Sequence, residues 1–260
     1  CIRDSVILNF FNDNPIWVEK YYSAHLYPYI YKAHYFFFER FSYPIGDLLY
    51  VIGILFIPIL ILNLFRKKLS IGLIFINITS FFSLVFLIFN LNWGLNYYRL
   101  PLSKKMNLDI EYNKTELINT FNYLIQSTNL LHIKLTKDRN KIVKVSHESD
   151  QIIEMICKEF HFFQKFEQKV FLKKSLWSNL LNYMGFAGYL NPFTLESNIN
   201  LNIPKLNFIV TAAHEMAHQV GFASESEANF IAFITSFKNS DPHIRYAGLT
   251  FALHYCYSNL

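Results

Sequence analysis

Two long apolar stretches separated by three residues constrain how this chain can fold more than any other feature. Leu48 to Phe65 is apolar apart from Asn63, and Leu69 to Leu91 is interrupted only by small or uncharged polar residues. Each stretch is about long enough, as a helix, to cross the hydrocarbon core of a bilayer. We therefore expect a transmembrane helical hairpin over residues 48–92. The alternative is a pair of buried core helices in a large soluble domain.

Composition and charge favour the membrane hairpin. The 260 residues are 52% hydrophobic and 18% aromatic, which is far richer in large apolar side chains than soluble domains usually are. The turn at residues 66–68 reads Arg-Lys-Lys, and the positive-inside rule places such a turn in the cytoplasm. The chain after the hairpin then lies outside the cytoplasm, and Trp93 and Tyr97 lie where an interfacial aromatic belt is expected.

Residues 1–47 form an aromatic segment that we expect to be extracytoplasmic or interfacial. Aromatic and small polar residues alternate over residues 16–43. This pattern allows two interpretations, a helix lying on the outer membrane face or a packing segment buried in the extracytoplasmic domain. Residues 1–14 do not resemble a signal peptide, because they lack a basic start and a long apolar core.

Residues 93–260 change in character and predict one mostly helical domain with a little β structure. Thr115 is expected to cap a helix at 116–131, and Glu148 to Phe166 is expected to form another. Thr194 to Ile203 alternates apolar and polar residues and predicts a strand. If that strand lies at a sheet edge, it can bind an extended peptide by main-chain pairing.

The sequence His-Glu-Met-Ala-His at residues 214–218 predicts a zinc site on a helix. Positions i and i+4 lie on the same helix face, so His214 and His218 can bind one ion while Glu215 reaches a water bound to it. The preceding run at 206–213 is apolar or small. Unpaired histidines and a carboxylate would be costly in such a buried helix, which favours a bound metal.

A third ligand is expected just after the motif. Gly221 is a natural helix stop, and Ser224 opens a second helix whose first turn contains Glu225 and Glu227. Ser224 and Glu227 fit a capping box, which gives Glu227 a structural role and favours Glu225 as the metal ligand, with Glu227 as the alternative. The alternative is that neither glutamate binds a metal and both merely favour the helix N-terminus through its dipole. Asn229, one turn later, is a candidate partner for a ligand.

Three stretches carry a resemblance to a known family. The segment HEMAHQVGFASESEANF, with NYMGFAGYLNPFTLESNINLNIP upstream and NWGLNYYRLPL after the hydrophobic span, resembles a bacterial membrane family catalogued as domain of unknown function 3810. That family looks like a branch of the HExxH zinc peptidases. The resemblance implies a multi-pass protein of the bacterial inner membrane with a zincin-like extracytoplasmic domain. It also implies an earlier spanning helix, of which Ile2 to Phe11 would be the tail.

A second similarity concerns the third ligand. Residues 225–229 are similar to the Glu-x-x-Ala-Asp motif of membrane-bound gluzincins such as the CaaX prenyl peptidases, in which the first Glu binds zinc. This similarity implies that Glu225 is the ligand. Those enzymes have a longer gap before that Glu, and Asn229 replaces their Asp. The metzincin pattern is not met, because Ser224 occupies the position of its third histidine.

Several other residues are candidates for contacts with a substrate. Gly185 and Gly188, in the loop before the expected strand, would let the backbone approach the site closely. His243, Arg245 and Tyr246 follow the second motif helix and could supply an oxyanion or substrate contact, or could be ordinary polar surface residues.

The remaining histidines and cysteines indicate no further site. Six histidines show no ligand spacing and are interpreted as packing or surface residues: His25, His34, His132, His147, His161 and His254. The three cysteines show no CxxC pattern and indicate neither a zinc ribbon nor a disulfide framework: Cys1, Cys157 and Cys256. The net charge of +5 is spread along the chain without basic and aromatic interleaving, so nucleic acid is not an expected partner.

The sequence therefore predicts a membrane-anchored zinc metallopeptidase that hydrolyses peptide bonds in a peptide or protein substrate. Glu215 would be the general base, and His214, His218 and Glu225 would hold zinc. The competing prediction is a membrane-anchored zinc-binding protein or pseudopeptidase sensor that does not hydrolyse its ligand.

Overall fold

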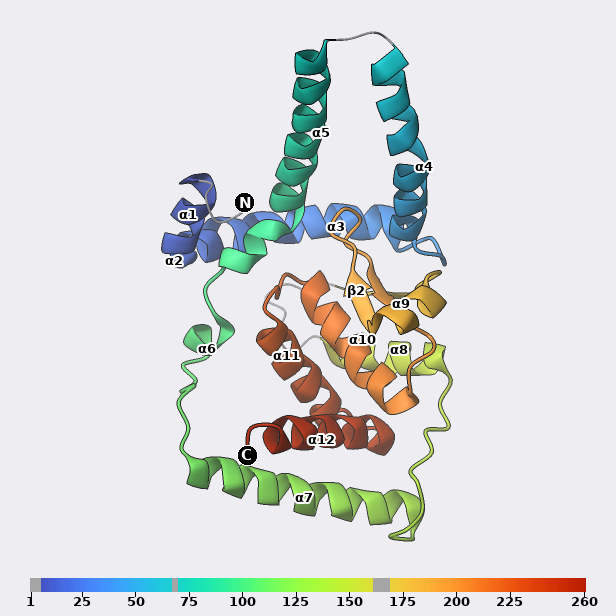
Figure 1. Ribbon diagram of the computed structural model, residues 1–260. Helices are drawn as coiled ribbons and strands as arrows, with labels where there is room; N and C mark the ends of the chain where they lie inside the picture. Colours follow the sequence, from blue (N-terminus) through green and yellow to red (C-terminus); the bar gives the residue numbers. More distant parts are fainter. Residues whose placement is uncertain (1–5, 67–69, 161–168) are drawn as a thin grey trace.

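The computed structural model describes residues 6–66, 70–160 and 169–260. It is mostly helical and contains a small three-stranded sheet (Figure 1). Several residues of the sequence predictions lie outside the described part: Lys67, Lys68, the start of the expected remnant helix, Cys1, His161, and the end of the expected helix at 148–166.

The two apolar stretches form the two helices predicted for them. These helices are α4 (Ile45–Arg66) and α5 (Ile71–Asn92), which project from the rest of the fold in the same direction (Figure 1). Their most apolar windows have mean hydropathies of 2.5 and 2.4, and only 11% and 0% of these windows are buried. Both helices are therefore long and apolar enough to cross a membrane, and neither lies in a core.

The aromatic N-terminal segment is helical and is partly buried. It contains α1 (Val6–Asp13), α2 (Pro15–Trp17), a π-helical stretch η2 (Val18–Leu26) and α3 (Tyr27–Phe38). Tyr27 and Tyr31 are buried, whereas Tyr29 and Phe36 remain exposed. Helix α3 runs across the base of the hairpin (Figure 1). One side of the segment therefore packs into the body of the protein, and the other presents aromatic rings at the surface.

The chain after the hairpin begins with short helices and then a long one. It forms η3 (Gly94–Tyr98), α6 (Leu102–Lys105), α7 (Lys114–Thr136) and α8 (Ser149–Glu159). The prediction of Thr115 as a cap was wrong, because Asn113 accepts a bond from the amide of Glu116 while the Glu116 carboxylate accepts one from the amide of Asn113. This reciprocal pair starts the helix two residues earlier than expected.

The sheet corrects the prediction of an edge strand at 194–203. Its strands are β1 (Leu172–Lys174), β2 (Gly188–Leu190) and β3 (Ser197–Ile199), in the order β1-β3-β2. β3 is therefore the central strand, parallel to β1 and antiparallel to β2. Leu195 has a φ of 53°, a left-handed conformation that cannot continue a strand, so the extended segment begins only at Ser197. The edge strands are β1 and β2, and Gly188 of β2 lies against Glu215 of the motif helix.

Four helices complete the domain around one core. They are α9 (Ser178–Met184), α10 (Lys205–Gln219), α11 (Glu225–Lys238) and α12 (Pro242–Tyr257). The fully buried Ile209 and Met216 of α10 pack with Ile156 of α8, Ile231 of α11 and Ile244 of α12. Burying such a side chain contributes about 1.5–3 kcal/mol. Helix α10, which carries the HExxH motif, therefore lies in the centre of the domain.

Candidate metal centre

The two motif histidines lie on one face of α10. The ring centroids of His214 and His218 are 4.6 Å apart, as their spacing of one helical turn requires. The helix ends at Gln219, and Gly221 then takes a φ of 93°, which favours glycine. This turn directs the chain back toward the histidines and into α11.

Helix α11 places Glu225 beside the two imidazoles. Its carboxylate oxygens lie 3.2 Å from Nε2 of His214 and 3.5 Å from Nε2 of His218. One ligand atom from each of the three residues lies within 4.8 Å of the others. The sequence favoured Glu225 over Glu227, and the structure brings Glu225 to the histidines.

Glu227 has a different structural role from the capping box that the sequence predicted. Ser224 makes no side-chain hydrogen bond to the start of α11, so the capping-box prediction was wrong. Instead, Oε1 of Glu227 accepts a hydrogen bond from the backbone amide of Leu102, 125 residues earlier in the chain. Glu227 therefore holds the start of α6 against α11, a contact that local sequence pattern does not reveal.

Each histidine is oriented by a hydrogen bond on its other ring nitrogen. Nδ1 of His214 lies 2.8 Å from Oδ1 of Asn229, and Nδ1 of His218 lies 2.7 Å from the carbonyl oxygen of Phe222. Such partners fix the tautomer in which Nε2 has a free lone pair. Both Nε2 atoms therefore face Glu225 in the form that a metal ion requires.

Glu215 lies buried next to these residues and has an unsatisfied oxygen. Its Oε2 is buried and has no hydrogen-bond partner among the described residues. Burial raises the pKa of Glu215 to about 8. A buried carboxylate without a partner is costly, and a nearby cation with its water would satisfy it. This orphaned oxygen and the His2Glu donor set fit a divalent metal such as zinc.

The surroundings shift the pKa values of the three donors in different directions. Burial, with His218 nearby, lowers the pKa of His214 to about 4 and keeps that ring neutral. For His218, burial opposes protonation, but the hydrogen bond to Glu225 and the charge of Glu215 outweigh it and raise the pKa. The pKa of Glu225 is lowered, first by its hydrogen bond to His218. Glu225 is therefore ionised near neutral pH.

One of the two predicted glycines lies against the site. A Cβ atom at Gly188 would lie 2.8 Å from Cγ of Glu215 and 2.8 Å from the carbonyl oxygen of Asn198. The backbone of β2 therefore approaches Glu215 as closely as the prediction required. At Gly185, in contrast, a Cβ would meet nothing within 4 Å, and its φ of 77° ends α9. Gly185 serves the turn and not the site.

The carbonyl groups at the end of α10 are bonded by segments on both sides of the hairpin. Nε1 of Trp93, one residue after α5, donates to the carbonyl of His218 at 3.1 Å. The hydroxyl of Tyr27 donates to the carbonyl of Gln219 at 2.7 Å, and Nη1 of Arg99 donates to that of Gly221 at 2.7 Å. A helix end leaves such carbonyls without internal partners. The hairpin and the motif helix are thereby connected directly.

A cavity of about 600 Å³ opens beside His214 and Glu215. Gly188 of β2 lies at one wall, and apolar side chains from α10 and α12 line much of the rest, including Leu206, Val210 and Phe251. Pockets of this size and lining are typical of small-molecule or peptide sites. The sequence did not single out these apolar residues, because their spacing is that of any buried helix face.

The structure does not bring three of the predicted contact residues to this group. Both Nε and Nη2 of Arg245 donate to the carbonyl oxygen of Asn239, and the hydroxyl of Tyr246 pairs with the ring of His132. His243 lies next to Asp241. The part of α12 that lines the cavity is farther along the helix, from Ala247 to His254.

Comparison with known proteins identifies a family but no characterised relative. A family model described as "Protein of unknown function (DUF3810)" matches residues 22–260. No curated protein and no solved structure matches the chain. The function must therefore be inferred from the geometry of the site.

Proposed function

The chain belongs to the family described as "Protein of unknown function (DUF3810)", and within that family we propose that it is a membrane-anchored zinc metallopeptidase. His214, His218 and Glu225 would hold the metal, and Glu215 would be the general base. The observation that supports this most strongly is the His2Glu group with the orphaned carboxylate oxygen of Glu215 beside it.

The chemistry requires one contribution from the metal and two from the protein. Zinc, when bound, polarises the scissile carbonyl and makes water a better acid. Glu215 takes a proton from the attacking water and later donates it to the leaving amine. Asn229 and the carbonyl of Phe222 hold the two imidazoles in the orientation that binding requires.

The cavity supports a peptide as the substrate. β2 is an edge strand whose residue Gly188 lies against Glu215, so an extended peptide pairing with β2 would pass the general base. The apolar wall formed by Leu206, Val210 and Phe251 would accept an apolar side chain of that peptide. This arrangement gives β2 the role that the sequence assigned to residues 194–203.

The exposed apolar surfaces of α4 and α5 support a membrane anchor. Soluble proteins rarely expose apolar patches larger than a few hundred Å², whereas almost the whole apolar length of both helices is exposed. We place the basic end of α4, at Arg66, in the cytoplasm and the metal centre on the opposite side, by the positive-inside rule. The location would be the bacterial inner membrane, with the lipid bilayer as a partner.

The test compares the wild-type protein with the Glu215→Gln and Glu154→Gln variants, each purified in detergent and loaded with zinc. Wild-type protein should cleave a quenched fluorescent peptide library, and the Glu215→Gln variant should lose on the order of 10²–10⁴-fold in rate while keeping about one zinc at this site. Glu154→Gln is the matched control, because Glu154 is an exposed residue of α8 that pairs with Lys158. Wild-type protein that binds zinc but cleaves no peptide would instead indicate the non-hydrolytic zinc-binding protein.

A further inference from the structure

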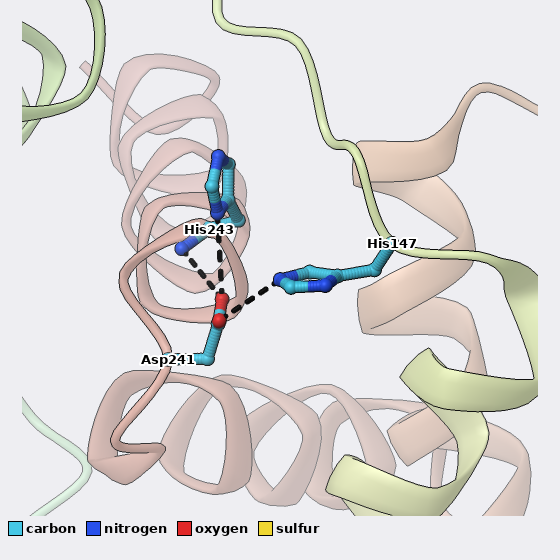
Figure 2. Close-up of side chains that lie close together, drawn as sticks. All are labelled: His147, Asp241 and His243. Atoms are coloured by element: carbon cyan, nitrogen blue, oxygen red, sulfur yellow. Dashed lines mark hydrogen bonds and ion pairs between the residues drawn. The ribbon is translucent and has the colours of Figure 1, made fainter.

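A second group of metal-binding side chains lies at the start of α12. His147 comes from the segment before α8, while Asp241 and His243 flank the first residue of α12. Nε2 of His147 lies 2.9 Å from Oδ2 of Asp241, and Nδ1 of His243 lies 3.6 Å from Oδ1 of Asp241. One ligand atom from each residue lies within 4.8 Å of the others. Figure 2 shows both rings pointing toward the carboxylate.

The two carboxylate oxygens of Asp241 have different partners. Its Oδ1 caps α12 by accepting hydrogen bonds from the amides of His243 and Ile244, at 2.8 and 3.1 Å. The other oxygen, Oδ2, faces the ring of His147. Capping therefore explains why the aspartate is there and fixes its direction, but it does not require two histidines around it.

His243 supplies the second, independent observation. Its Nδ1 is buried and has no hydrogen-bond partner among the described residues. The side chain as a whole is only partly exposed, at 22%. A helix cap with one His–Asp pair would leave this nitrogen unsatisfied at a cost. A ligand between the two rings and the carboxylate would satisfy it.

We propose that His147, Asp241 and His243 bind a divalent transition-metal ion, such as Zn²⁺, at a site separate from the HExxH motif. Two imidazoles and a carboxylate are a donor set that suits zinc. Ligands about 2.0–2.1 Å from zinc lie roughly 3.3 Å apart in a tetrahedron. Nε2 of His147 lies 2.9 Å from Oδ2 of Asp241, Nδ1 of His243 lies 3.6 Å from Oδ1, and one donor atom from each residue lies within 4.8 Å of the others, so binding requires only a small movement of these side chains. Each histidine binds as the neutral ring, and water completes the coordination.

The location indicates a structural clamp. The carbonyl of His147 accepts a hydrogen bond from Nζ of Lys205 at the start of α10, and Nδ2 of Asn239 donates to the carbonyl of Met155 in α8. The starts of α8, α10 and α12 thus meet here. An ion that links His147 to Asp241, 94 residues later, would hold these three helices together. It would stabilise the helix that carries the HExxH motif without contacting that motif.

The experiment removes the two motif histidines and measures how much zinc the protein still binds. The full-length His214→Ala/His218→Ala protein in detergent is dialysed against micromolar Zn²⁺, and bound zinc is measured by mass spectrometry. We expect about one zinc per chain and a higher melting temperature than in chelator. A third substitution in this double variant, either His147→Gln or Asp241→Asn, should abolish both the bound zinc and the rise in melting temperature. Asn at position 241 keeps an acceptor for the N-cap of α12. His132→Gln, which removes a histidine that contacts α12 elsewhere, is the matched control.

A second measurement covers the case in which the double variant does not fold. In the otherwise unaltered protein, His147→Gln should lower bound zinc by one per chain while peptide cleavage per folded molecule persists. The proposal is overturned if zinc content and melting temperature are the same with and without the His147 and Asp241 substitutions. Loss of zinc only upon substitution of His214 or His218 would likewise overturn it, and would leave the proposed function standing.

Discussion

The side-chain oxygen Oδ1 of Asn229 lies 2.8 Å from Nδ1 of His214. This contact joins α11 to α10 and directs Nε2 of His214 toward Glu225, so one residue serves to position a neighbouring ligand. The Nδ2 group of Asn229 is itself held by the hydroxyl of Tyr255 from α12. Three helices therefore cooperate in orienting one imidazole.

Replacing Asn229 should weaken metal binding without removing any ligand. Asn229→Ala should reduce zinc affinity by about 10–100-fold, because losing an outer hydrogen-bond partner has an effect of this size. Asn229→Asp keeps an acceptor at the same position and should restore most of the affinity. Competition with a chromophoric chelator measures both variants. Unchanged affinity in Asn229→Ala would show that the ring is held by other contacts.

Two neighbouring glutamates should give opposite phenotypes. Glu225→Ala should lose most of the zinc at the motif site, because it removes a ligand. Glu227→Ala should keep that zinc but lower the free energy of unfolding by about 1 kcal/mol, because the amide of Leu102 loses its partner. Zinc content and thermal unfolding distinguish the variants. The reverse pattern would assign the metal to Glu227.

Substitution of Gly188 should lower activity, whereas substitution of Gly185 should lower stability. Gly188→Ala places a Cβ 2.8 Å from Cγ of Glu215, and a displaced general base should lower the cleavage rate by about 100-fold. Gly185→Ala meets no neighbouring atom but is strained at a φ of 77°, which should cost roughly 1–2 kcal/mol of stability. Its activity per folded molecule should be unchanged. Comparing rates at equal amounts of folded protein separates these effects.

Glu19 should make stability depend on pH in the acid range. Burial opposes its ionisation, but Arg99 and Lys105 outweigh burial and lower the pKa of Glu19 below its ordinary value of 4.5. At pH values above 4.5 the ionised carboxylate of Glu19 therefore stabilises the folded protein. This stabilisation is lost as the pH falls through the lowered pKa of Glu19 in the folded state. Glu19→Gln should be less stable than wild type at pH 7, by about 1 kcal/mol.

The difference between Glu19→Gln and wild type should shrink as the pH is lowered below about 4. Thermal unfolding of both proteins across pH 3–7 measures it. A difference that stays constant over this range would attribute the effect to packing of Glu19 and not to its charge. The ion pair joins η2 to the chain after the hairpin, with Nε of Arg99 and Oε2 of Glu19 3.0 Å apart.

The sequence was most informative where a pattern is local. The two apolar helices and the turn at Gly221 depend on residues close together in the chain, and all of them appear in the structure. The pairing of β1 with β3 and the contact of Glu227 with Leu102 join distant segments. No periodicity encodes such contacts, because they depend on how helices pack in three dimensions. The same holds for His147, whose partner Asp241 lies 94 residues away.

The buried ion pair of Lys173 and Glu196 is another contact that the sequence does not reveal. Nζ of Lys173 in β1 lies 2.6 Å from Oε1 of Glu196, and both side chains are almost fully buried. The same carboxylate accepts hydrogen bonds from the amides of Ile45 and Gly46 at the start of α4. In sequence, Lys173 belongs to a short charged stretch that looks like surface. Only the folded chain shows that it secures the hairpin to the sheet.

The hydrogen bond from Nε1 of Trp93 to the carbonyl of His218 fixes the distance between the end of α5 and the HExxH motif. Trp93 follows directly on α5, so with α5 in the bilayer the second motif histidine lies within one side chain's length of the lipid boundary. If the proposed metallopeptidase function and membrane anchor hold, we expect peptide bonds close to the membrane surface to be cleaved more readily than bonds far from it.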